Sequence, residues 1–215
     1  MIIKLLIWAL IIEGLCFFSR IENIQLRNNN MKEIILITGD LAAGKSTFSK
    51  LIADRYKVTC YNKDDIKEIL GDNFGFKNRE ENLKLSVCTF DIFKYIIQKN
   101  MKVNESLIIE SNFRQHELDY IKQKAQESDY KIITIVIRAD IMILHKRFIN
   151  RIENENRHPV HKAVDFSNYY DFEKRIREDR IRIYPGEIVY LDSSSFNDLY
   201  KDENFEKIDL LLGRL

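Results

Sequence analysis

The sequence predicts a three-layer α/β domain built around a five-stranded parallel sheet. Short β-branched runs alternate with longer helical patterns along the chain, which is typical of βαβ units. Most of these runs are apolar almost throughout, as strands are when helices cover both faces of a sheet. The chain has 215 residues, of which 45% are hydrophobic, and this is long enough for one well-buried core.

The individual elements are expected from their hydrophobic periods. The strands are expected at Glu33–Thr38, Lys57–Tyr61, Ser106–Glu110, Lys131–Ile137 and Glu187–Leu191. The helices are expected at Lys45–Tyr56, Asp64–Leu70, Glu80–Lys99, Gln115–Ser128, Ile141–Ile152, Phe166–Ile183 and Glu203–Leu212. In the third helix the apolar residues that recur at helical spacing include Leu83, Val87, Phe90, Phe93 and Ile97. A ligand is expected beyond the carboxyl ends of the strands.

The first 30 residues are expected to lie outside this domain. Their apolar run from Leu5 to Ile12 is broken by Glu13 and is shorter than the ~20 residues of a membrane-spanning helix. No small-x-small cleavage site of a signal peptide follows. We therefore expect residues 1–30 to be an apolar extension, or the product of a start upstream of Met31, and residues 31–215 to form the domain. No stable membrane insertion is expected.

The charges and the cysteines narrow the class of partner and the compartment. The 34 Lys and Arg residues nearly balance 33 Asp and Glu residues, so no global field favours a polyanion, although a local basic groove is still allowed. Cys16, Cys60 and Cys88 have neither CxxC spacing nor a matching His cluster. This argues against a disulfide framework or a structural zinc and favours the cytoplasm.

A phosphate-binding loop connects the first expected strand to the first expected helix. The residues Gly39–Ser46 fit the Walker A pattern GxxxxGK[ST]. Its glycines let backbone N–H groups point at a phosphate, its lysine would lie between the β- and γ-phosphates, and its serine would offer a hydroxyl to Mg²⁺. ATP and Mg²⁺ are therefore the predicted cofactors. The predicted nucleotide-binding residues are Gly39, Asp40, Leu41, Ala42, Ala43, Gly44, Lys45, Ser46 and Thr47.

Acidic residues follow two other strands at the edge where the ligand is expected. Asp64 and Asp65 come after the second strand, where one carboxylate could accept a hydroxyl proton while Lys67 positions an anion. Alternatively, either Asp could cap the following helix. Glu110 ends the third strand and is a candidate to lie near Mg²⁺, directly or through water. The alternative for Glu110 is an ordinary solvated strand end.

Arginines follow the fourth strand. Arg147 and Arg151 are four residues apart and therefore share a helix face, and Arg157 follows in a polar segment. Arginines on a closing segment can neutralise the charge of a transferred phosphoryl group. A solvated helix face is the alternative. His158 and His161 have no third ligand nearby in the sequence, so a metal site is not expected there.

Together these motifs resemble the P-loop kinase group that includes the 5′-kinase domain of polynucleotide kinase, chloramphenicol phosphotransferase-like enzymes and zeta-toxin-like kinases. The residues that carry the resemblance are GDLAAGKST, NKDDIKEIL, IIESNF and HKRFINR, between about Ile34 and Arg157. The resemblance implies a P-loop NTPase fold with a small helical lid. It also implies that Asp64 is the general base, that Lys67 faces a substrate phosphate and that Arg147 and Arg151 belong to the lid. The segment NRHPVH, which ends at His161, resembles an RHPGH-type element of uncharacterised ATP-binding members.

Two residues depart from the pattern of the group. Glu110 replaces the more usual Asp, and Lys67 replaces Arg, which weakens the expectation of a bidentate contact with an acceptor phosphate. The resemblance therefore supports a kinase more than it supports a particular acceptor.

The sequence predicts a kinase that transfers the γ-phosphate of Mg-ATP to a hydroxyl of a small molecule or of a nucleic-acid 5′ end. The balanced charge favours the small molecule. The alternative is a nucleotide-binding regulatory or toxin-system module without a dedicated small acceptor. The predicted catalytic residues are Lys45, Asp64, Arg147 and Arg151. The predicted substrate residues are Asp65, Lys67, Asn112 and Arg157, and the predicted Mg²⁺ residues are Ser46 and Glu110.

Overall fold

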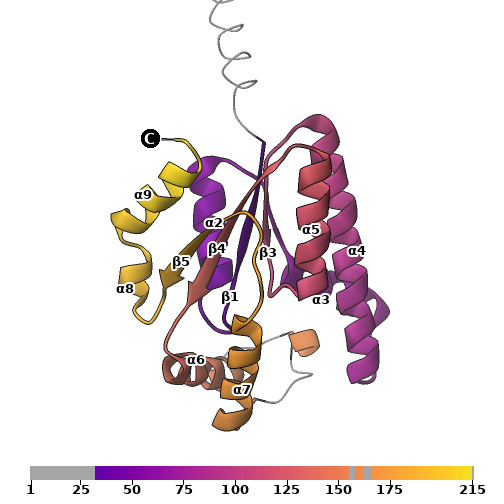
Figure 1. The fold of residues 1–215 in the computed structure, drawn as a ribbon. Coiled ribbons are helices and arrows are strands. Elements are labelled where there is room, and N and C mark those ends of the chain that lie inside the picture. The colour runs from indigo at the N-terminus through magenta and orange to yellow at the C-terminus, as the bar shows by residue number, and fades with distance from the viewer. Residues whose placement is uncertain (1–31, 155–157, 162–165, 215) are drawn as a thin grey trace, which may run out of the picture. The chain divides into compact units, whose positions relative to one another are not determined.

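The fold is centred on a five-stranded parallel sheet, as the sequence predicts. The computed structural model of the chain describes residues 32–154, 158–161 and 166–214 (Figure 1). The strands have the order β2-β3-β1-β4-β5, so the strand that leads into the phosphate-binding loop lies in the middle. Their bounds are β1 Glu33–Gly39, β2 Cys60–Asn62, β3 Leu107–Glu110, β4 Lys131–Arg138 and β5 Glu187–Asp192.

All seven predicted helices form, with ends that shift by a few residues. They are α2 Lys45–Tyr56, α3 Lys63–Phe74, α4 Arg79–Val103, α5 Gln115–Glu127, α6 Ile141–Asn154, α7 Tyr169–Arg180 and α9 Asp202–Leu211. Two short elements were not predicted, the 3₁₀ turn η1 (Pro159–His161) and the single-turn helix α8 (Phe196–Leu199). Both are too short to carry a hydrophobic period of their own.

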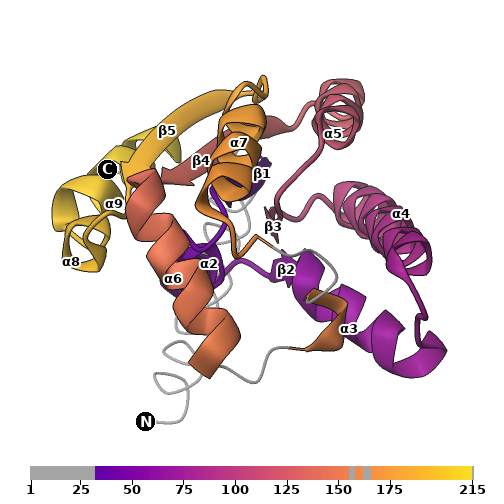
Figure 2. The ribbon, with the colours of Figure 1, turned by 90° about the horizontal axis from the view of Figure 1, so that it is seen from below.

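Helices cover both faces of the sheet and make three layers (Figure 2). The side chains of β1 alternate between the faces. Ile35 and Ile37 pack in a cluster with residues of α2, α6, α7, α8 and α9, whereas Ile34 and Leu36 pack with residues of α4 and α5. All four are fully buried, which explains why this strand is apolar throughout.

Helix α4 buries only some of its regularly spaced apolar residues, and the predicted burial of one strand is wrong. In α4, Leu83 and Val87 are exposed, because the buried stripe of this helix passes through Leu85 and continues to Met101. The expectation that both faces of every strand are buried fails at β5. This strand lies at the edge of the sheet, and its buried residues alternate with exposed ones.

The helices α6 and α7 form the small helical lid beyond the carboxyl end of the sheet (Figure 1). They contact each other through aromatic rings, with 5.3 Å between the ring centroids of Phe148 and Phe172. The predicted extension at residues 1–30 and the predicted substrate residue Arg157 lie outside the described residues. Among the helices that are described, none is long and apolar enough to cross a membrane.

Candidate active site

The loop between β1 and α2 needs glycine at both of its ends. Gly39 has a φ of 128°, and a Cβ there would lie 1.9 Å from the carbonyl oxygen of Ile137 in β4. Gly44 has a φ of 86°, and a Cβ there would lie 2.8 Å from Phe196 of α8. Both conformations disfavour an L side chain. The loop is therefore tightly packed against its neighbours on two sides, which fixes its shape.

A cavity of about 520 Å³ lies at the carboxyl ends of β1 and β3. This is where the parallel sheet predicts a ligand. The cavity gathers most of the predicted site residues from distant parts of the chain. Those that line it are Leu41, Ala42, Ala43, Gly44, Lys45, Ser46, Thr47, Asp64, Lys67, Glu110, Asn112, Arg147 and Arg151.

Three predicted site residues among the described ones do not line the cavity. They are Gly39, Asp40 and Asp65. Gly39 shapes the start of the loop, and Asp65 is exposed on α3. The cavity therefore distinguishes two neighbouring acids that the sequence could not separate, because Asp64 is part of its wall.

Lys45 lies at the base of the cavity. Its ammonium donates a hydrogen bond of 2.6 Å to the carbonyl oxygen of Asp40 and is 3.4 Å from that of Gly39. The side chain is buried, and this burial lowers the pKa of Lys45 because it disfavours the charged form. A bound phosphate would give this buried cation an anionic partner.

Asp40 anchors the loop to the lid. Its buried carboxylate accepts two hydrogen bonds from the guanidinium of Arg180 in α7, at 2.6 and 3.2 Å. It also accepts one from the backbone N–H of Ala139, at 3.2 Å. The side chain of Asp40 thus points away from the predicted phosphate position, while its carbonyl holds Lys45. The sequence analysis did not predict the contact with Arg180. The acidic residue Asp40 within the loop was the only hint that a cation would lie nearby.

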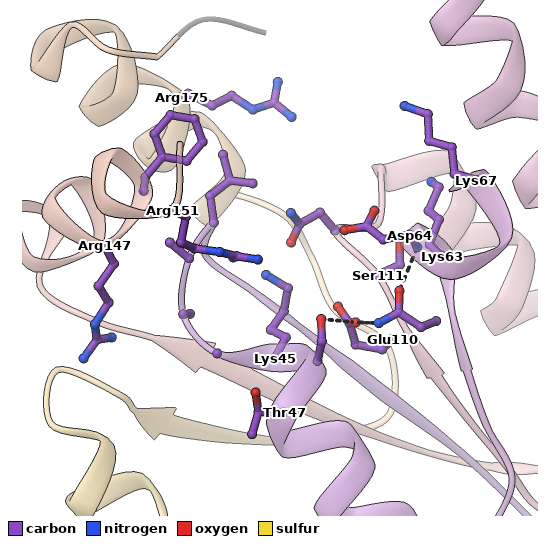
Figure 3. A pocket seen from close by; sticks show the side chains of 18 of the residues that line it. Lys45, Thr47, Lys63, Asp64, Lys67, Glu110, Ser111, Arg147, Arg151 and Arg175 are labelled. Carbon is purple, nitrogen blue, oxygen red and sulfur yellow. Dashed lines mark hydrogen bonds between the residues drawn. The ribbon is translucent and has the colours of Figure 1, made fainter. Parts of the chain in front are cut away.

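Ser46 and Glu110, which is labelled in Figure 3, both line the cavity and contact each other. The Ser46 hydroxyl donates a 3.0 Å hydrogen bond to Oε2 of Glu110, and the Asn62 amide donates to the same oxygen. Glu110 is buried, so it is not a solvated strand end. Burial raises the pKa of Glu110 to about 7. A hydroxyl beside a carboxylate is a set of hard oxygen donors that suits Mg²⁺.

Asp64 belongs to the first turn of α3 without capping it. The cap is Asn62, whose side-chain oxygen accepts a 2.7 Å hydrogen bond from the Asp64 backbone N–H. The alternative in which Asp64 or Asp65 caps the helix is therefore wrong. The Asp64 side chain is 59% exposed while it lines the cavity, so its carboxylate is accessible to a bound molecule.

Cations border the cavity on opposite sides. Figure 3 shows Lys63 and Lys67 on the same side as Asp64, and the labelled arginines on the other side. Lys63 forms a 2.7 Å ion pair with Glu117. Lys67 donates a 2.7 Å hydrogen bond to Asn82, and burial lowers the pKa of Lys67.

The two predicted lid arginines point in different directions although they share a helix face. The guanidinium of Arg147 lies over the ring of Phe196, 3.9 Å from its centroid, and donates a 3.1 Å hydrogen bond to the carbonyl of Ser194. Arg151 extends instead towards the centre of the cavity, near Lys45 (Figure 3). Arg175 of α7 also lines the cavity and was not predicted.

Three buried polar atoms of residues that line the cavity lack a hydrogen-bond partner within the described parts of the chain. They are Nη1 of Arg147 and, directly after β3, the hydroxyl of Ser111 and the side-chain oxygen of Asn112. Leaving a buried polar group unpaired is costly, so such groups call for a ligand or a water molecule. Asn112, a predicted substrate residue, and Ser111, which was not predicted, thus each present a polar atom at the cavity wall that is unpaired within the described residues.

Comparisons with known proteins identify the fold. The sequence matches no protein-family model and no curated protein sequence. A candidate kinase from Chloroflexus aurantiacus shares 25% sequence identity, with a TM-score of 0.74 over 84% of this chain and 98% of that one. Shikimate kinase from Bacteroides thetaiotaomicron shares 18% identity, with a TM-score of 0.55 over 85% and 99% of the two chains. A structure from the PezAT toxin–antitoxin system of Streptococcus pneumoniae shares 14% identity, with a TM-score of 0.50 over 92% and 94%.

The chain therefore has the fold of P-loop kinases. The predicted resemblance is confirmed at the level of this group, whereas the narrower links to polynucleotide kinase and chloramphenicol phosphotransferase stay predictions. Within the described residues, no group of three or more His, Cys, Asp or Glu side chains could hold a metal ion by itself. A metal at this site would therefore need oxygens from a bound nucleotide or from water, in addition to those of Ser46 and Glu110.

Proposed function

We propose that the chain is an ATP-dependent kinase that phosphorylates a hydroxyl group of a small molecule. One observation carries this proposal. Lys45, the pair of Ser46 and Glu110, and the accessible carboxylate of Asp64 all border the same cavity. Lys45, Ser46 and Glu110 suit a nucleoside triphosphate with its metal ion. Asp64 suits an acceptor that approaches from the opposite side.

The loop would bind the phosphates of ATP. Its backbone N–H groups and the N-terminus of α2 favour negative charge, and Lys45 adds a positive charge. Ser46 and Glu110 would hold Mg²⁺, directly or through water. When bound, this ion neutralises charge on the β- and γ-phosphates. We assign Arg147 to the nucleotide, because its partner Phe196 borders the loop at Gly44.

Asp64 would act as the general base. The acceptor oxygen forms a bond to the γ-phosphorus, the bond from that phosphorus to the β-phosphate oxygen breaks, and the hydroxyl proton passes to the Asp64 carboxylate. Arg151 points at the region between Asp64 and the loop and would stabilise the charge of the transferred group (Figure 3). We assign contacts with the acceptor to Lys67 and Asn112.

The size of the cavity supports a small acceptor. The cavity of about 520 Å³, which the acceptor would share with the phosphates of ATP, is within the usual range of small-molecule sites. Shikimate kinase, one of the solved structures with this fold, is named for a small hydroxylated acid. A nucleic-acid 5′ end would need further phosphate contacts, and the balanced charge of the chain does not favour them. The cytoplasm would supply the ATP.

A screen with γ-labelled ATP tests this proposal. Purified protein is incubated with Mg-ATP and with sugars, hydroxy acids, nucleosides, aminoglycoside-like alcohols and 5′-hydroxyl oligonucleotides, and transfer of the label is measured. Label on one small acceptor is the expected result. Label on the oligonucleotide would show that the acceptor is a nucleic-acid 5′ end and not a small molecule. Binding of ATP without transfer to any acceptor would favour a regulatory or toxin-system module.

The role of Asp64 is tested with the acceptor that the screen identifies. The substitution Asp64→Asn should reduce transfer by roughly 10²–10⁴-fold, because a positioned general base is lost. The affinity for ATP should be preserved, and α3 should begin normally because Asn62 provides its cap. The matched control is Asp65→Asn, which changes an exposed acid outside the cavity. Undiminished transfer by Asp64→Asn would refute the assignment.

A further inference from the structure

The sequence HPVH, His158–His161, is the one motif that the proposed kinase reaction leaves without a role. It includes the turn η1 and lies against α3, the helix that carries Asp64 and Lys67. None of its four residues lines the cavity. It therefore lies behind the acceptor side of the site, where it contacts the residues that form the wall.

Val160 fits into a gap in α3 that exists because residue 71 is glycine. Val160 is 1% exposed, and a Cβ at Gly71 would lie 2.3 Å from its Cγ1. Glycine inside a helix costs about 1 kcal/mol relative to alanine. Here the glycine leaves room for a side chain from a distant part of the chain. The close contact between α3 and the segment therefore depends on both Gly71 and Val160.

Asn82 of α4 connects this segment to Lys67. Its side-chain oxygen accepts the 2.7 Å hydrogen bond from the Lys67 ammonium, and its amide nitrogen donates a 2.9 Å hydrogen bond to the carbonyl of Val160. The orientation of the amide is fixed by chemistry, because an ammonium can only donate and a carbonyl can only accept. Asn82 is buried, so the three groups form a short chain away from solvent.

The two histidines hold the carboxylates of α3. His158 Nε2 lies 2.8 Å from Asp72, and His161 Nε2 lies 2.8 Å from Glu68. The other ring nitrogen of His161, Nδ1, is 3.9 Å from the carboxylate of Asp64. Contacts of this kind restrict the orientation of the groups that they touch. One short segment thus lies next to Asp64 and is connected to Lys67 through Asn82.

We infer that the segment His158–His161 is a positioning element of the acceptor site, which fixes Lys67 through Asn82 and places the His161 ring beside Asp64. This rests on the proposed function, in which Asp64 and Lys67 face the acceptor. The segment acts on the reaction without touching the substrate. Its loss should therefore affect the acceptor and leave the binding of ATP at the loop unchanged.

The substitution Gly71→Ala tests this inference. The added methyl group displaces Val160, while the higher helix propensity of alanine supports α3 itself, so the protein should stay folded. We expect kcat/KM for the acceptor to fall by about 10–100-fold, as for other losses of positioning, with the KM for ATP within about twofold of the wild type. Thermal unfolding verifies that the variant is folded.

A second substitution provides a rescue. In Gly71→Ala/Val160→Ala the clashing Cγ1 is removed. The closest remaining contacts of the added methyl group are Cε1 of His158, at 3.3 Å, and the Cβ of residue 160, at 3.8 Å, so the His158 ring needs to shift by only a few tenths of an ångström. The segment can then dock again, and most of the acceptor kcat/KM should return. A general packing defect would instead become worse in the double variant, because a buried side chain is truncated.

Labelling of Lys67 gives a readout that needs no acceptor. Proteins are treated briefly with an amine-acylating reagent, and the modification of Lys67 is compared with that of the exposed Lys122 by mass spectrometry. Displacement of the segment should raise the ratio severalfold in Gly71→Ala and restore it in the double variant. Unchanged labelling of Lys67 in Gly71→Ala would overturn the inference, as would unchanged acceptor kinetics. Absence of transfer by the wild type would refute the proposed function, and the labelling would still decide the positioning.

Discussion

Glu110 illustrates how burial changes the chemistry of a single side chain. At the end of β3 it is surrounded by protein, and the desolvation of its carboxylate raises its pKa to about 7. The Lys45 ammonium and the Ser46 hydroxyl act in the opposite direction, because they favour the charged form. The sequence places a carboxylate at this strand end, but its burial depends on the surrounding elements.

This pKa makes a prediction for stability. Between about pH 4.5 and pH 7 the folded protein holds a proton on Glu110 that the unfolded chain releases, so the contribution of this group to stability is lost as the pH rises through 7. Glu110→Gln should therefore stabilise the protein at pH 8, by up to a few kcal/mol, and have a smaller effect at pH 5. Thermal unfolding at both pH values measures this. The control is Glu105→Gln at an exposed position, and a difference that does not vary with pH would contradict the account.

The loop residues Leu41 to Thr47, which line the cavity, could be predicted from the sequence because the loop motif is local. The surroundings of the arginines could not. Helical spacing puts Arg147 and Arg151 on one face. However, the guanidinium of Arg147 packs on the ring of Phe196, which lies nearly 50 residues later in the chain. Similarly, the choice between Asp64 and Asp65 depends on the cap at Asn62 and on which carboxylate meets the cavity. These are tertiary contacts without a sequence period.

At the scale of elements, the pair of Asp40 and Arg180 connects the phosphate-binding loop with the end of α7. Asp40 is nearly inaccessible to solvent, whereas 28% of the Arg180 side chain is exposed. The guanidinium also donates a 2.6 Å hydrogen bond to the carbonyl of Ala139, which follows β4. The Arg180 side chain thus joins the lid to the loop. A displacement of α7 should therefore also displace the loop.

We predict that Arg180→Met destabilises the protein by up to about 3 kcal/mol, because it leaves the carboxylate of Asp40 buried without its cation. It should also weaken the binding of ATP, since the Asp40 carbonyl positions Lys45. The matched control on the same helix is Arg177→Met, whose exposed pair with Glu173 should contribute no more than about 1 kcal/mol. Urea unfolding compares the two, and equal losses of stability would contradict a special role for Arg180.

At the scale of the whole molecule, the sequence was sufficient to predict the five strands and the seven long helices. Each of these has a hydrophobic period or a continuous apolar run. The order of the strands in the sheet could not be predicted in the same way, because it depends on the pairing of strands that are far apart in the sequence. The contacts of η1 could not be predicted either, since a single turn has no period and its partners lie in α3 and α4.

The predicted extension of residues 1–30 can be tested on the whole molecule. We expect the chain from residue 31 to 215 to fold and to bind ATP as the full chain does, because β1 begins at Glu33 and the described core is formed by residues after it. Thermal unfolding and ATP titration of both proteins measure this. A large loss of stability in the shorter protein would show that the first 30 residues contribute to the fold.

The central claim is that the loop at the base of the cavity binds Mg-ATP, and calorimetric titration tests it most directly. Wild-type protein, Lys45→Ala and the surface control Lys122→Ala are titrated with a non-hydrolysable ATP analogue and Mg²⁺. We predict that wild type and Lys122→Ala bind equally well and that Lys45→Ala binds at least about tenfold more weakly, because a buried charge-assisted contact with phosphate is lost. Equal affinity of Lys45→Ala, or no binding by the wild type, would contradict the account.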